Sequence, residues 1–399
     1  MKNFFLSDPK LLLYGFAIVF FASYGQTFFI SIFSEQIRES YSLSDGEFGL
    51  VYALGTLAGS IILVAFAKLI DHIDLRLYSL IVSVGLAIAC AGVYISYESI
   101  FFLFFLIFGL RFFGQGAMSH AGDTTMSRYF GNNRGKALSF ASFGGQIGVM
   151  FLPIIAVKFL NIISWQQVWM IASLSILIIF IPFLFLSLKN QNTRHLNFKE
   201  NNKEIKNRRK WRTREIIFEK KFYIYLPLSI AAPFIGTGLF FHQVFIANQK
   251  NWTLEMLASG YVLLGVFSII GLILGGSIVD RFTARKVIMY KPLPLFLAII
   301  ILIFFDGYLA MFIYLSLLGL NMGIGSPLIG SLWAELYGLE SLGVVKALLH
   351  ATAAFASALS PVIFGYIIDF GMGIVVIGII SIIIITYSTF LTIYYQNIE

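Results

Sequence analysis

Charged side chains are scarce in this sequence of 399 residues. Only 12% of the residues are Asp, Glu, Lys or Arg, whereas about 25% are charged in an ordinary soluble domain. Hydrophobic residues make up 58%, and they include 42 Phe and 19 Tyr. A water-soluble fold of this length could not bury so much apolar surface, which excludes a set of ordinary soluble domains. The composition indicates a chain that uses lipid as part of its solvent.

Cysteine is almost absent, because Cys90 is the only one. A single cysteine excludes an intramolecular disulfide and leaves the redox compartment undetermined. His, Cys and acidic residues show no metal-site spacing, so neither a metal site nor a cofactor is predicted. The first apolar run is too long for the core of a signal peptide and no small-residue cleavage site follows it, so we interpret it as a membrane helix.

The sequence is rich in long apolar runs. A helix needs about 20 mostly apolar residues to cross the hydrocarbon core, and these runs lack the alternation of barrel strands. The sequence therefore predicts an all-α membrane protein with 12 transmembrane helices. The predicted spans are Leu11–Phe33, Phe48–Ala67, Leu77–Tyr97, Ile100–Met126, Ala137–Val157, Trp165–Leu188, Phe222–Ile246, Met256–Val279, Val287–Phe305, Tyr308–Ala334, Ala347–Ile368 and Ile374–Tyr395.

Lys and Arg lie almost entirely on one side of the predicted spans. Of the 28 basic residues, 24 fall in segments on the side of the N-terminus, and Arg111 lies inside a span. The other side carries only Arg38, Lys158 and Lys250. Since basic residues mark the cytoplasmic side, both termini are predicted to be cytoplasmic. The predicted location is the cell membrane, which is the inner membrane if the host is bacterial.

Residues 189–221 form the only long polar stretch, with 12 basic and 4 acidic residues. This stretch divides the spans six and six, which predicts a bundle at 1–188, a cytoplasmic linker at 189–221 and a second bundle at 222–399. Next to a membrane, its basic run Arg208-Arg209-Lys210-Trp211-Arg212 is typical of contact with anionic lipid headgroups rather than with nucleic acid.

The two predicted halves repeat each other at an offset of 209 residues. The segment Ala67–His72 after the second span corresponds to Gly276–Arg281 after the eighth. The same offset places Gly114-Gln115-Gly116 on Gly323-Ile324-Gly325. A tandem duplication explains both matches, so we expect two pseudo-symmetric six-helix bundles.

These motifs resemble those of the major facilitator superfamily, whose transporters are two six-helix bundles joined by a cytoplasmic loop. The loop signature Gly-x-x-x-Asp-Arg-x-Gly-x-Arg-Lys is matched in the second half except for Thr283 at the second glycine. The first copy keeps fewer of these residues. The resemblance implies a gating role for Asp71, Arg76, Gly276, Asp280, Arg281 and Arg285. The chain is only loosely similar to bacterial monocarboxylate porters, since the eighth span lacks the basic residue that they place there.

Pairs of small residues four positions apart allow close helix crossings in lipid. Such pairs occur at Gly55 and Gly59, Gly144 and Gly148, Gly271 and Gly275, and Ala354 and Ala358. The resemblance implies that their four helices form the interface between the bundles. The alternative is that glycine is simply common in membrane helices.

Arg111 lies near mid-depth of the fourth predicted span. A charge at that depth costs at least about 2.5 kcal/mol, so it requires a partner or a cavity. Its guanidinium could bind an anionic group of a substrate, or a carboxylate during the coupling cycle. Alternatively, it ties helices together by donating to backbone carbonyls. Both interpretations are compatible with the sequence.

Other polar and aromatic residues fall in spans that line the cavity of the superfamily, or next to them. Buried polar groups need partners, so each of these residues faces water, a substrate or another helix. With Arg111, the predicted substrate-binding residues are Tyr24, Gln26, Gln146, Phe241, His242, Gln243 and Asn321. Proton coupling requires a titratable group, and the candidates are His120 with Asp123, one helical turn apart, or His242. Ordinary contacts at the inner headgroups are the alternative for His120 and Asp123.

The predicted function is secondary active transport of a small organic solute, anionic or zwitterionic, by alternating access with proton coupling. Efflux of drugs, metabolites or siderophores is the alternative within the same fold. A membrane receptor or enzyme is disfavoured, because the segment Gly131–Lys136 is one residue short of a nucleotide-binding loop. The predicted partners are the solute, protons and membrane lipid, with no nucleic acid, and the chain is predicted to be a monomer and not an enzyme.

Overall fold

The computed structural model describes residues 8–95, 99–130, 133–201, 211, 213–338 and 341–396. Within these residues every regular element is a helix. Eleven of the described helices are long and apolar enough to cross a membrane, and a bent pair, Pro9–Gly25 with Thr27–Tyr41, supplies a twelfth span. The predicted all-α membrane fold is therefore confirmed.

Two compact units make up the chain. The first comprises the described residues of Met1–Ser42 and Leu54–Lys206, and the second those of Leu43–Ala53 and Asn207–Glu399. The predicted domain bounds stay a prediction. The segment Leu43–Ala53, which begins the second span, groups with the second unit although the rest of that span belongs to the first.

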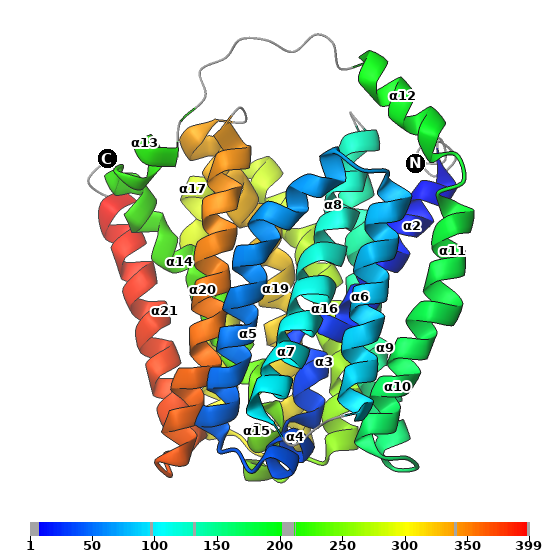
Figure 1. The fold of residues 1–399 in the computed structure, drawn as a ribbon. Helices are drawn as coiled ribbons and strands as arrows, with labels where there is room; N and C mark the ends of the chain where they lie inside the picture. The colour runs from blue at the N-terminus through cyan, green and yellow to red at the C-terminus, as the bar shows by residue number, and fades with distance from the viewer. Residues whose placement is uncertain are drawn as a thin grey trace. The chain divides into compact units, whose positions relative to one another are not determined.

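Six spans begin in the first half of the chain, drawn from blue to green in Figure 1. Several consist of consecutive helical pieces. Their bounds are α2 (Pro9–Ala22), η1 (Ser23–Gly25), α3 (Thr27–Ile30), η2 (Ser31–Phe33), α4 (Ser34–Tyr41), α5 (Asp45–Phe66), η3 (Ala67–Asp71), α6 (Leu75–Ile95), α7 (Ile100–Gly109), η4 (Leu110–Met118), α8 (Ser119–Tyr129), α9 (Arg134–Leu160), α10 (Trp165–Ser175), η6 (Ile176–Phe180) and α11 (Ile181–Ser187). A polar helix, α12 (Gln191–Asn201), follows them.

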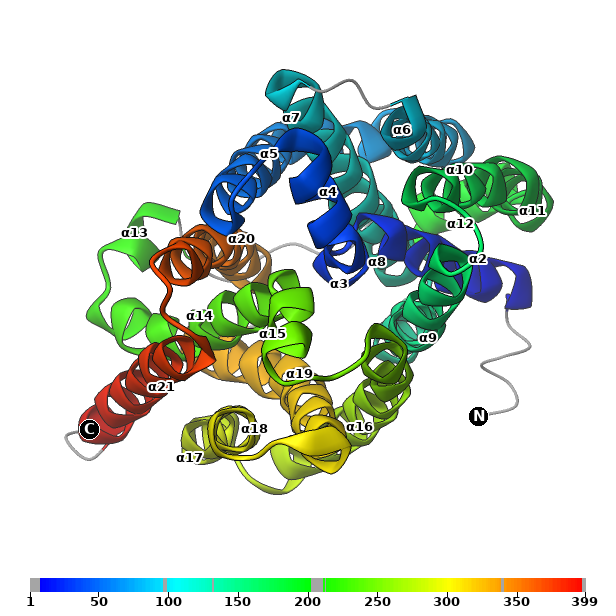
Figure 2. The same ribbon diagram turned by 90° about the horizontal axis from the view of Figure 1, so that it is seen from below.

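The second unit contains the remaining six spans. Short helices precede or extend some of them. Their bounds are α13 (Thr213–Ile217), α14 (Lys220–Phe241), α15 (Gln243–Gln249), α16 (Leu254–Arg281), α17 (Ala284–Val287), η7 (Ile288–Tyr290), α18 (Leu293–Phe304), α19 (Gly307–Tyr337), α20 (Leu342–Asp369) and α21 (Ile374–Gln396). Seen end-on in Figure 2, α16 lies beside α19 and α14 beside α20, the two most extensive helix contacts of this unit.

The repeat is visible in the backbone as well as in the sequence. Phe33 of the first span and His242 after the seventh are 209 positions apart. Both interrupt their helix with nearly the same dihedral angles, φ −96° and ψ 12° at Phe33 and φ −95° and ψ 22° at His242. The predicted seventh span, Phe222–Ile246, therefore ends as a regular helix at Phe241. A short helix continues after the break.

The small-residue pairs serve crossings inside the units. Gly55 and Gly59 of α5 pack against Ile107 and Phe112 of the fourth span. Gly144 of α9 packs so closely on α2 that a Cβ there would overlap the carbonyl oxygen of Phe16. Glycine at these positions lets the helix backbones approach each other without a side chain between them. The role at the bundle interface implied by the resemblance stays a prediction.

The pair Gly271 and Gly275 of α16 faces α19 in the same way. A Cβ at Gly271 would lie 2.6 Å from the carbonyl oxygen of Leu320, and one at Gly275 would lie 2.7 Å from Cγ of Pro327. From the other side of this crossing, a Cβ at Gly323 would overlap the carbonyl oxygen of Ser268. The contact between α16 and α19 is thus glycine-mediated from both helices.

The helix α12 is attached to the first unit by side-chain hydrogen bonds. The Arg194 guanidinium contacts both carboxylate oxygens of Asp8, at 2.5 Å and 2.8 Å, and Asp8 itself accepts from the Leu11 amide at the start of α2. Gln191 donates to the Tyr129 hydroxyl at 2.7 Å. The predicted linker therefore begins as a helix that is docked on the ends of the first and fourth spans.

Substitution of Arg194 by alanine is expected to loosen α12 without unfolding the unit. The ion pair is partly exposed, so its loss should cost about 1 kcal/mol or less and raise amide exchange in α12 about fivefold. Hydrogen–deuterium exchange of the peptide 191–196 measures this. Arg214→Ala, in the second unit, is the control and should leave α12 unchanged. Equal exchange in wild type and Arg194→Ala would show that the ion pair does not hold the helix.

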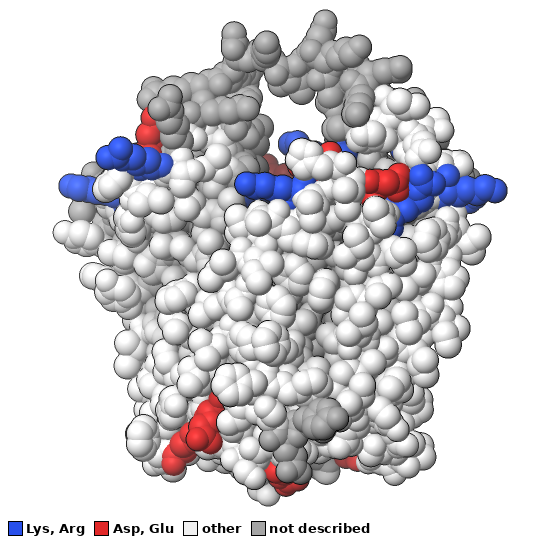
Figure 3. Space-filling model, viewed as in Figure 1, with Lys and Arg blue, Asp and Glu red and all other residues white. Residues whose placement is uncertain are grey.

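Most of the basic run Arg208–Arg212 lies outside the described residues. Its Trp211 is described, and it packs edge-on against Tyr337 with ring centroids 5.4 Å apart. On the face drawn in Figure 3, Lys and Arg side chains gather near one end of the helices. The lipid contact and the cytoplasmic termini stay predictions.

Candidate functional site

The first membrane span is broken at Gln26. The helix tightens into the 3-10 turn η1, Gln26 adopts an extended conformation with φ −84° and ψ 151°, and α3 then starts again. The two parts are bent by 47°. Ser23 and Gly25 precede the break, which is consistent with the tendency of helices to kink at such residues. The break removes the carbonyl of Gly25 from the regular helical ladder.

The fourth span is also irregular at the point that faces this break. Residues Leu110–Met118 form the π-helical stretch η4, a conformation that is frequent at functional sites. A Cβ at Gly114 would lie 2.7 Å from Cα of Gly25, and a Cβ at Gly25 would overlap the carbonyl oxygen of Leu110. Two distorted backbones therefore touch through glycines in the interior of the first unit.

Arg111 lies on η4 and reaches the break. Its Nη1 donates to the carbonyl oxygen of Gly25 at 3.0 Å and to Oγ1 of Thr27 at 3.4 Å, and its Nε donates to Oγ1 of Thr56 at 3.1 Å. Only 3% of its surface is exposed. The guanidinium thus joins the first, second and fourth spans.

The hydrogen bond from Arg111 to the carbonyl of Gly25 is the kind of contact expected if Arg111 only ties helices together. It does not exclude the substrate-binding interpretation, because the carbonyl that Arg111 binds is the one released by the break. The role of Arg111 in substrate binding therefore stays a prediction.

The other predicted site residues of the first unit differ in their hydrogen bonding. The Tyr24 hydroxyl is within hydrogen-bond distance of Oγ of Ser175, at 3.0 Å. The Gln26 side chain is half-buried at the break. Oε1 of Gln146, on α9, is buried and has no hydrogen-bond partner among the described residues. A buried amide oxygen without a partner is costly, which makes Gln146 the strongest polar candidate after Arg111.

In the second unit the predicted residues cluster around the break after α14. Phe241 is buried and packs against Phe48 and Tyr52 of α5, with ring centroids 4.9 Å and 4.6 Å apart. Gln243 accepts a short hydrogen bond from the Tyr261 hydroxyl, which connects α15 to α16. Both contacts bring together residues that are distant in the sequence.

His242 and Asn321 are the other buried polar residues predicted in this unit. Nε2 of His242 lies 2.9 Å from the carbonyl oxygen of Pro361, and its Nδ1 lies 3.5 Å from a carboxylate oxygen of Asp45. Asn321 of α19 is 3% exposed, and its Oδ1 has no hydrogen-bond partner among the described residues. Their role in substrate binding stays a prediction.

His120 and Asp123 lie on α8, and the structure gives them different surroundings. Nε2 of His120 is 3.3 Å from Oγ1 of Thr124 on the same helix, in a partly buried position. Asp123 is exposed. Their proposed sharing of a proton stays a prediction.

The first copy of the loop motif forms two ion pairs. Asp71 contacts Arg128 at the end of α8, and Arg128 also donates to the carbonyl oxygen of Ile70 at 3.2 Å. Arg76 pairs with Asp74 at 2.9 Å and donates to Asn192 of α12. The bonded Arg76 guanidinium holds the pKa of the Asp74 carboxyl below its usual range, so this pair weakens as the pH falls.

The second copy is organised differently. Asp280 and Arg281 are exposed, and Gly276 has no atom of another element within 4 Å of the position its Cβ would take. The backbone amide of Arg285 donates to the carboxylate of Glu335 at 3.0 Å, and so does the amide of Ala284 at 2.7 Å. An acidic side chain at the end of α19 thus binds the start of α17. The gating roles stay predictions.

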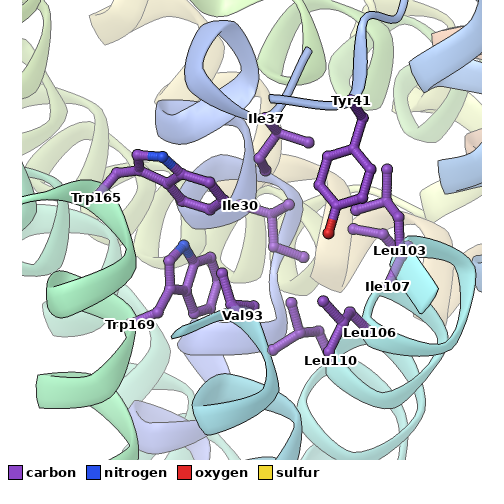
Figure 4. Close-up of a pocket in the computed structure, with 10 residues that line it drawn as sticks. All are labelled: Ile30, Ile37, Tyr41, Val93, Leu103, Leu106, Ile107, Leu110, Trp165 and Trp169. Atoms are coloured by element: carbon purple, nitrogen blue, oxygen red, sulfur yellow. The ribbon is translucent and has the colours of Figure 1, made fainter. Parts of the chain in front are cut away.

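The cavity drawn in Figure 4 is too small for a solute. Its accessible volume is about 10 Å³, enough for a single water, and it is lined by apolar groups such as Ile30, Leu106, Trp165 and Trp169. Solute sites usually measure hundreds of Å³. We interpret this cavity as a packing defect between the first, third, fourth and sixth spans.

Sequence reasoning missed several residues that complete these contacts. Gly25 and Thr56 hold Arg111, Asp45 faces His242, and Glu335 caps α17. Glu335 carried a usable signal, because an acidic residue near the C-terminal end of a helix is unfavourable and suggests a specific partner. The position of Gly25 next to Gln26 was a weaker signal for its contact with Arg111.

Comparison with known proteins agrees with this architecture. Two solved structures of a bacterial homologue of the human lysosomal transporter Spinster are similar to this chain, one inward-facing and unoccupied and the other inward-facing and occupied. The first is 15% identical with a TM-score of 0.63, covering 96% of this chain and 94% of its own. The second is 14% identical with a TM-score of 0.65, covering 97% and 96%.

The sequence itself gives the family. A search of curated proteins found no match. The sequence profile of the Major Facilitator Superfamily, however, matches residues 15–361, which is most of the chain. Together with the twelve-span helical fold, this match shows that the chain belongs to the major facilitator superfamily.

Proposed function

We propose that this chain is a proton-coupled secondary active transporter that moves a small organic solute, anionic or zwitterionic, by alternating access. Membership of the superfamily makes it a multi-pass membrane transporter, and the solute class and the coupling ion are the proposal. The observation that carries it is the meeting of the broken first span with η4 at Arg111. Secondary transporters build solute sites from discontinuous membrane helices, because unpaired backbone groups are tolerated there only when they line a site.

The chemistry of Arg111 suggests the solute class. A guanidinium recognises a carboxylate or phosphate through two parallel hydrogen bonds, and burial at this depth makes such a bond strong. The bond from Nη1 to Thr27 is long, at 3.4 Å, and Thr27 is the first residue after the break. A movement of α3 at Gln26 would therefore open Nη1 to the anionic group of a solute. Gln146, whose amide oxygen is buried without a partner among the described residues, would bind a donor group such as an ammonium.

The remaining parts of the proposal concern the coupling ion, the oligomeric state and the place of the chain in the membrane. Protons are the proposed coupling ion, because buried or partly buried His side chains occur in both units. The chain would act as a monomer in the cell membrane, the inner membrane in a bacterium, with both termini cytoplasmic. The basic segment between α11 and α14 would contact anionic lipid headgroups.

A ligand screen tests the solute class. Purified protein is heated in the presence of organic acids, amino acids, sugars and cationic drugs, and a bound solute raises the melting temperature by mass action. An anionic or zwitterionic compound is expected to stabilise. Its uptake into proteoliposomes should then fall at least about tenfold in Arg111→Lys, since lysine lacks the planar fork. Arg134→Lys, at the exposed start of α9, is the matched control.

Two results would contradict the proposal. Transport of an anionic compound that survives both Arg111→Lys and Arg111→Ala would remove Arg111 from the solute site. Uphill accumulation that is the same with and without a pH gradient would remove protons as the coupling ion.

A further inference from the structure

Lys291 is a basic residue buried inside the ninth span. It lies in the turn between η7 and α18, within the apolar helical stretch Ala284–Phe304. Only 3% of its surface is exposed. A charged side chain inside a span is costly unless it has a partner, and such residues mark binding sites more often than not. The surroundings of this amine therefore indicate what it binds.

The side chain of Lys291 has no polar partner in the part of the chain that the structure describes. Its backbone amide donates to the carbonyl oxygen of Ile288 at 3.1 Å, but its amine forms no hydrogen bond or ion pair with a described residue. An ammonium carries three donors. Leaving all of them unpaired in a buried position costs more than leaving a single neutral group unpaired. The position calls for an acceptor that the described residues do not supply.

The elements around Lys291 bring little negative charge. The most extensive contacts of η7 are with α17, α19 and α21. The helix α21 contains no acidic residue, and α17 contributes the basic Arg285 and Lys286. The one carboxylate of α19 is that of Glu335, which already accepts from the backbone amides of Ala284 and Arg285. Among the described residues of these elements, none offers a carboxylate to Lys291.

Gly325 of α19 makes room for the Lys291 side chain. A Cβ at Gly325 would lie 3.1 Å from Cε and 3.9 Å from Nζ of Lys291, and it would meet no other described atom within 4 Å. The lysine thus fills the space that the glycine leaves. Its amine lies directly over the backbone of α19.

The same face of α19 carries a second polar group without a partner. Asn321 precedes Gly325 by four residues, so the two positions are one helical turn apart, with Cβ positions roughly 5–6 Å from each other. Asn321 is 3% exposed, and its Oδ1 has no hydrogen-bond partner among the described residues. Gly319 and Gly323, which contact the backbone of α16, lie on the opposite face. The amine and the amide are therefore neighbours inside the second unit.

An ammonium beside a primary amide has the chemistry of a site for a small anion. The amide can turn either its oxygen or its NH2 group towards a ligand, since the two are nearly the same in shape. With the NH2 group turned inwards, both side chains donate. An anion also compensates the buried charge, which a neutral ligand cannot do. Lysine acts as a point charge without the planar fork of arginine, so a single ion or one carboxylate group suits it.

We propose that Lys291 and Asn321 form a binding site for a small anion with a single negative charge, either an inorganic ion such as chloride or the carboxylate of an organic acid. This inference goes beyond the proposed function, because the site lies within the second unit and involves neither Arg111 nor a coupling ion. The bound anion compensates the ammonium and so stabilises the second unit. An empty site leaves the charge uncompensated.

Thermal unfolding of the purified full chain tests the site. The protein is heated in sodium isethionate, whose sulfonate is larger, and in the same concentration of sodium chloride or sodium acetate. At least one of the two small anions should raise the melting temperature of the wild type by at least about 3 °C, because it binds only the folded chain. Stabilisation by chloride alone would identify an inorganic ion, and stabilisation by acetate would identify a carboxylate. Stabilisation by neither would overturn the proposal.

Substitutions locate the effect. Lys291→Met keeps the length of the side chain and removes the charge, so the difference between the salts should disappear. Asn321→Leu should reduce this difference to about half or less, since it removes one of the two donors. Lys346→Met removes an exposed lysine from α20 of the same unit and should respond to the salts like the wild type. A difference that persists in Lys291→Met would overturn the proposal.

Crystals of the wild-type chain give a second measurement that needs no variant. They are grown in the anion that stabilises the protein, with bromide in place of chloride because its anomalous scattering identifies it. The anion is expected beside Nζ of Lys291 and the amide of Asn321. An ordered water molecule in that place would overturn the site, even if Lys291→Met failed to fold.

Discussion

Gly323→Ala is expected to lower the free energy of unfolding by about 3 kcal/mol, because the added methyl carbon would clash with neighbouring atoms. It would overlap the carbonyl oxygen of Ser268 and lie 2.7 Å from the amide nitrogen of Leu272 and 2.9 Å from Cα of Gly271. All three are backbone atoms of α16, which cannot rotate away as a side chain can. The eighth and tenth spans would have to separate.

Thermal unfolding of the purified chain measures this effect, as a drop in the melting temperature of about 8 °C. Gly330→Ala on the same helix α19 is the matched control, since no atom lies within 4 Å of the added carbon. Alanine is the better helix former, so the control should melt at the wild-type temperature or slightly above it. Equal melting of the two variants would show that α16 and α19 do not cross at Gly323.

Arg111→Ala is expected to destabilise the first unit by about 3 kcal/mol even where no solute is present. The substitution leaves the Gly25 carbonyl and the Thr56 hydroxyl without the donor that they have in the structure. It also leaves a cavity between three spans. Arg111→Lys keeps the charge but supplies no planar fork, so an intermediate loss is expected.

Melting of the purified variants distinguishes this structural role from solute binding. Arg134→Ala, which removes an exposed arginine of the same unit, should change the melting temperature by less than about 1 °C. If Arg111→Ala melts like the wild type but binds no solute, the guanidinium serves the solute and not the fold. If Arg111→Ala unfolds at a lower temperature than the wild type and still binds the solute, the guanidinium serves the fold and not the solute.

The number and position of the spans followed from the sequence because hydrophobicity over about 20 residues is a property of the segment alone. The interruptions did not. Gln26 and His242 lie inside runs whose composition favours an unbroken span, and the structure places the first break against η4 and the second beside Pro361. The relation between the breaks at Phe33 and His242, which are 209 positions apart, was visible only once their backbone angles were known.

For the candidate site, the sequence singled out the residues that cost most to bury. Arg111 and His242 are both nearly fully buried, so the expectation that each requires a partner was sound. The identity of the partners depended on tertiary packing. Gly25 offers a carbonyl because its helix breaks, and Asp45 meets His242 because glycines at positions 49 and 365 let α5 approach α20. Neither glycine is part of a recognisable motif.

The boundary between the two units falls inside α5, between Ala53 and Leu54, where the helix is continuous. Domain borders normally fall in exposed loops, and an intact helix offers no joint at which to bend. Residues 43–53 are therefore assigned to the second unit by their contacts in space and not by their position along the helix. Because the helix is continuous from Asp45 to Phe66, any displacement of residues 45–53 also displaces the rest of that span.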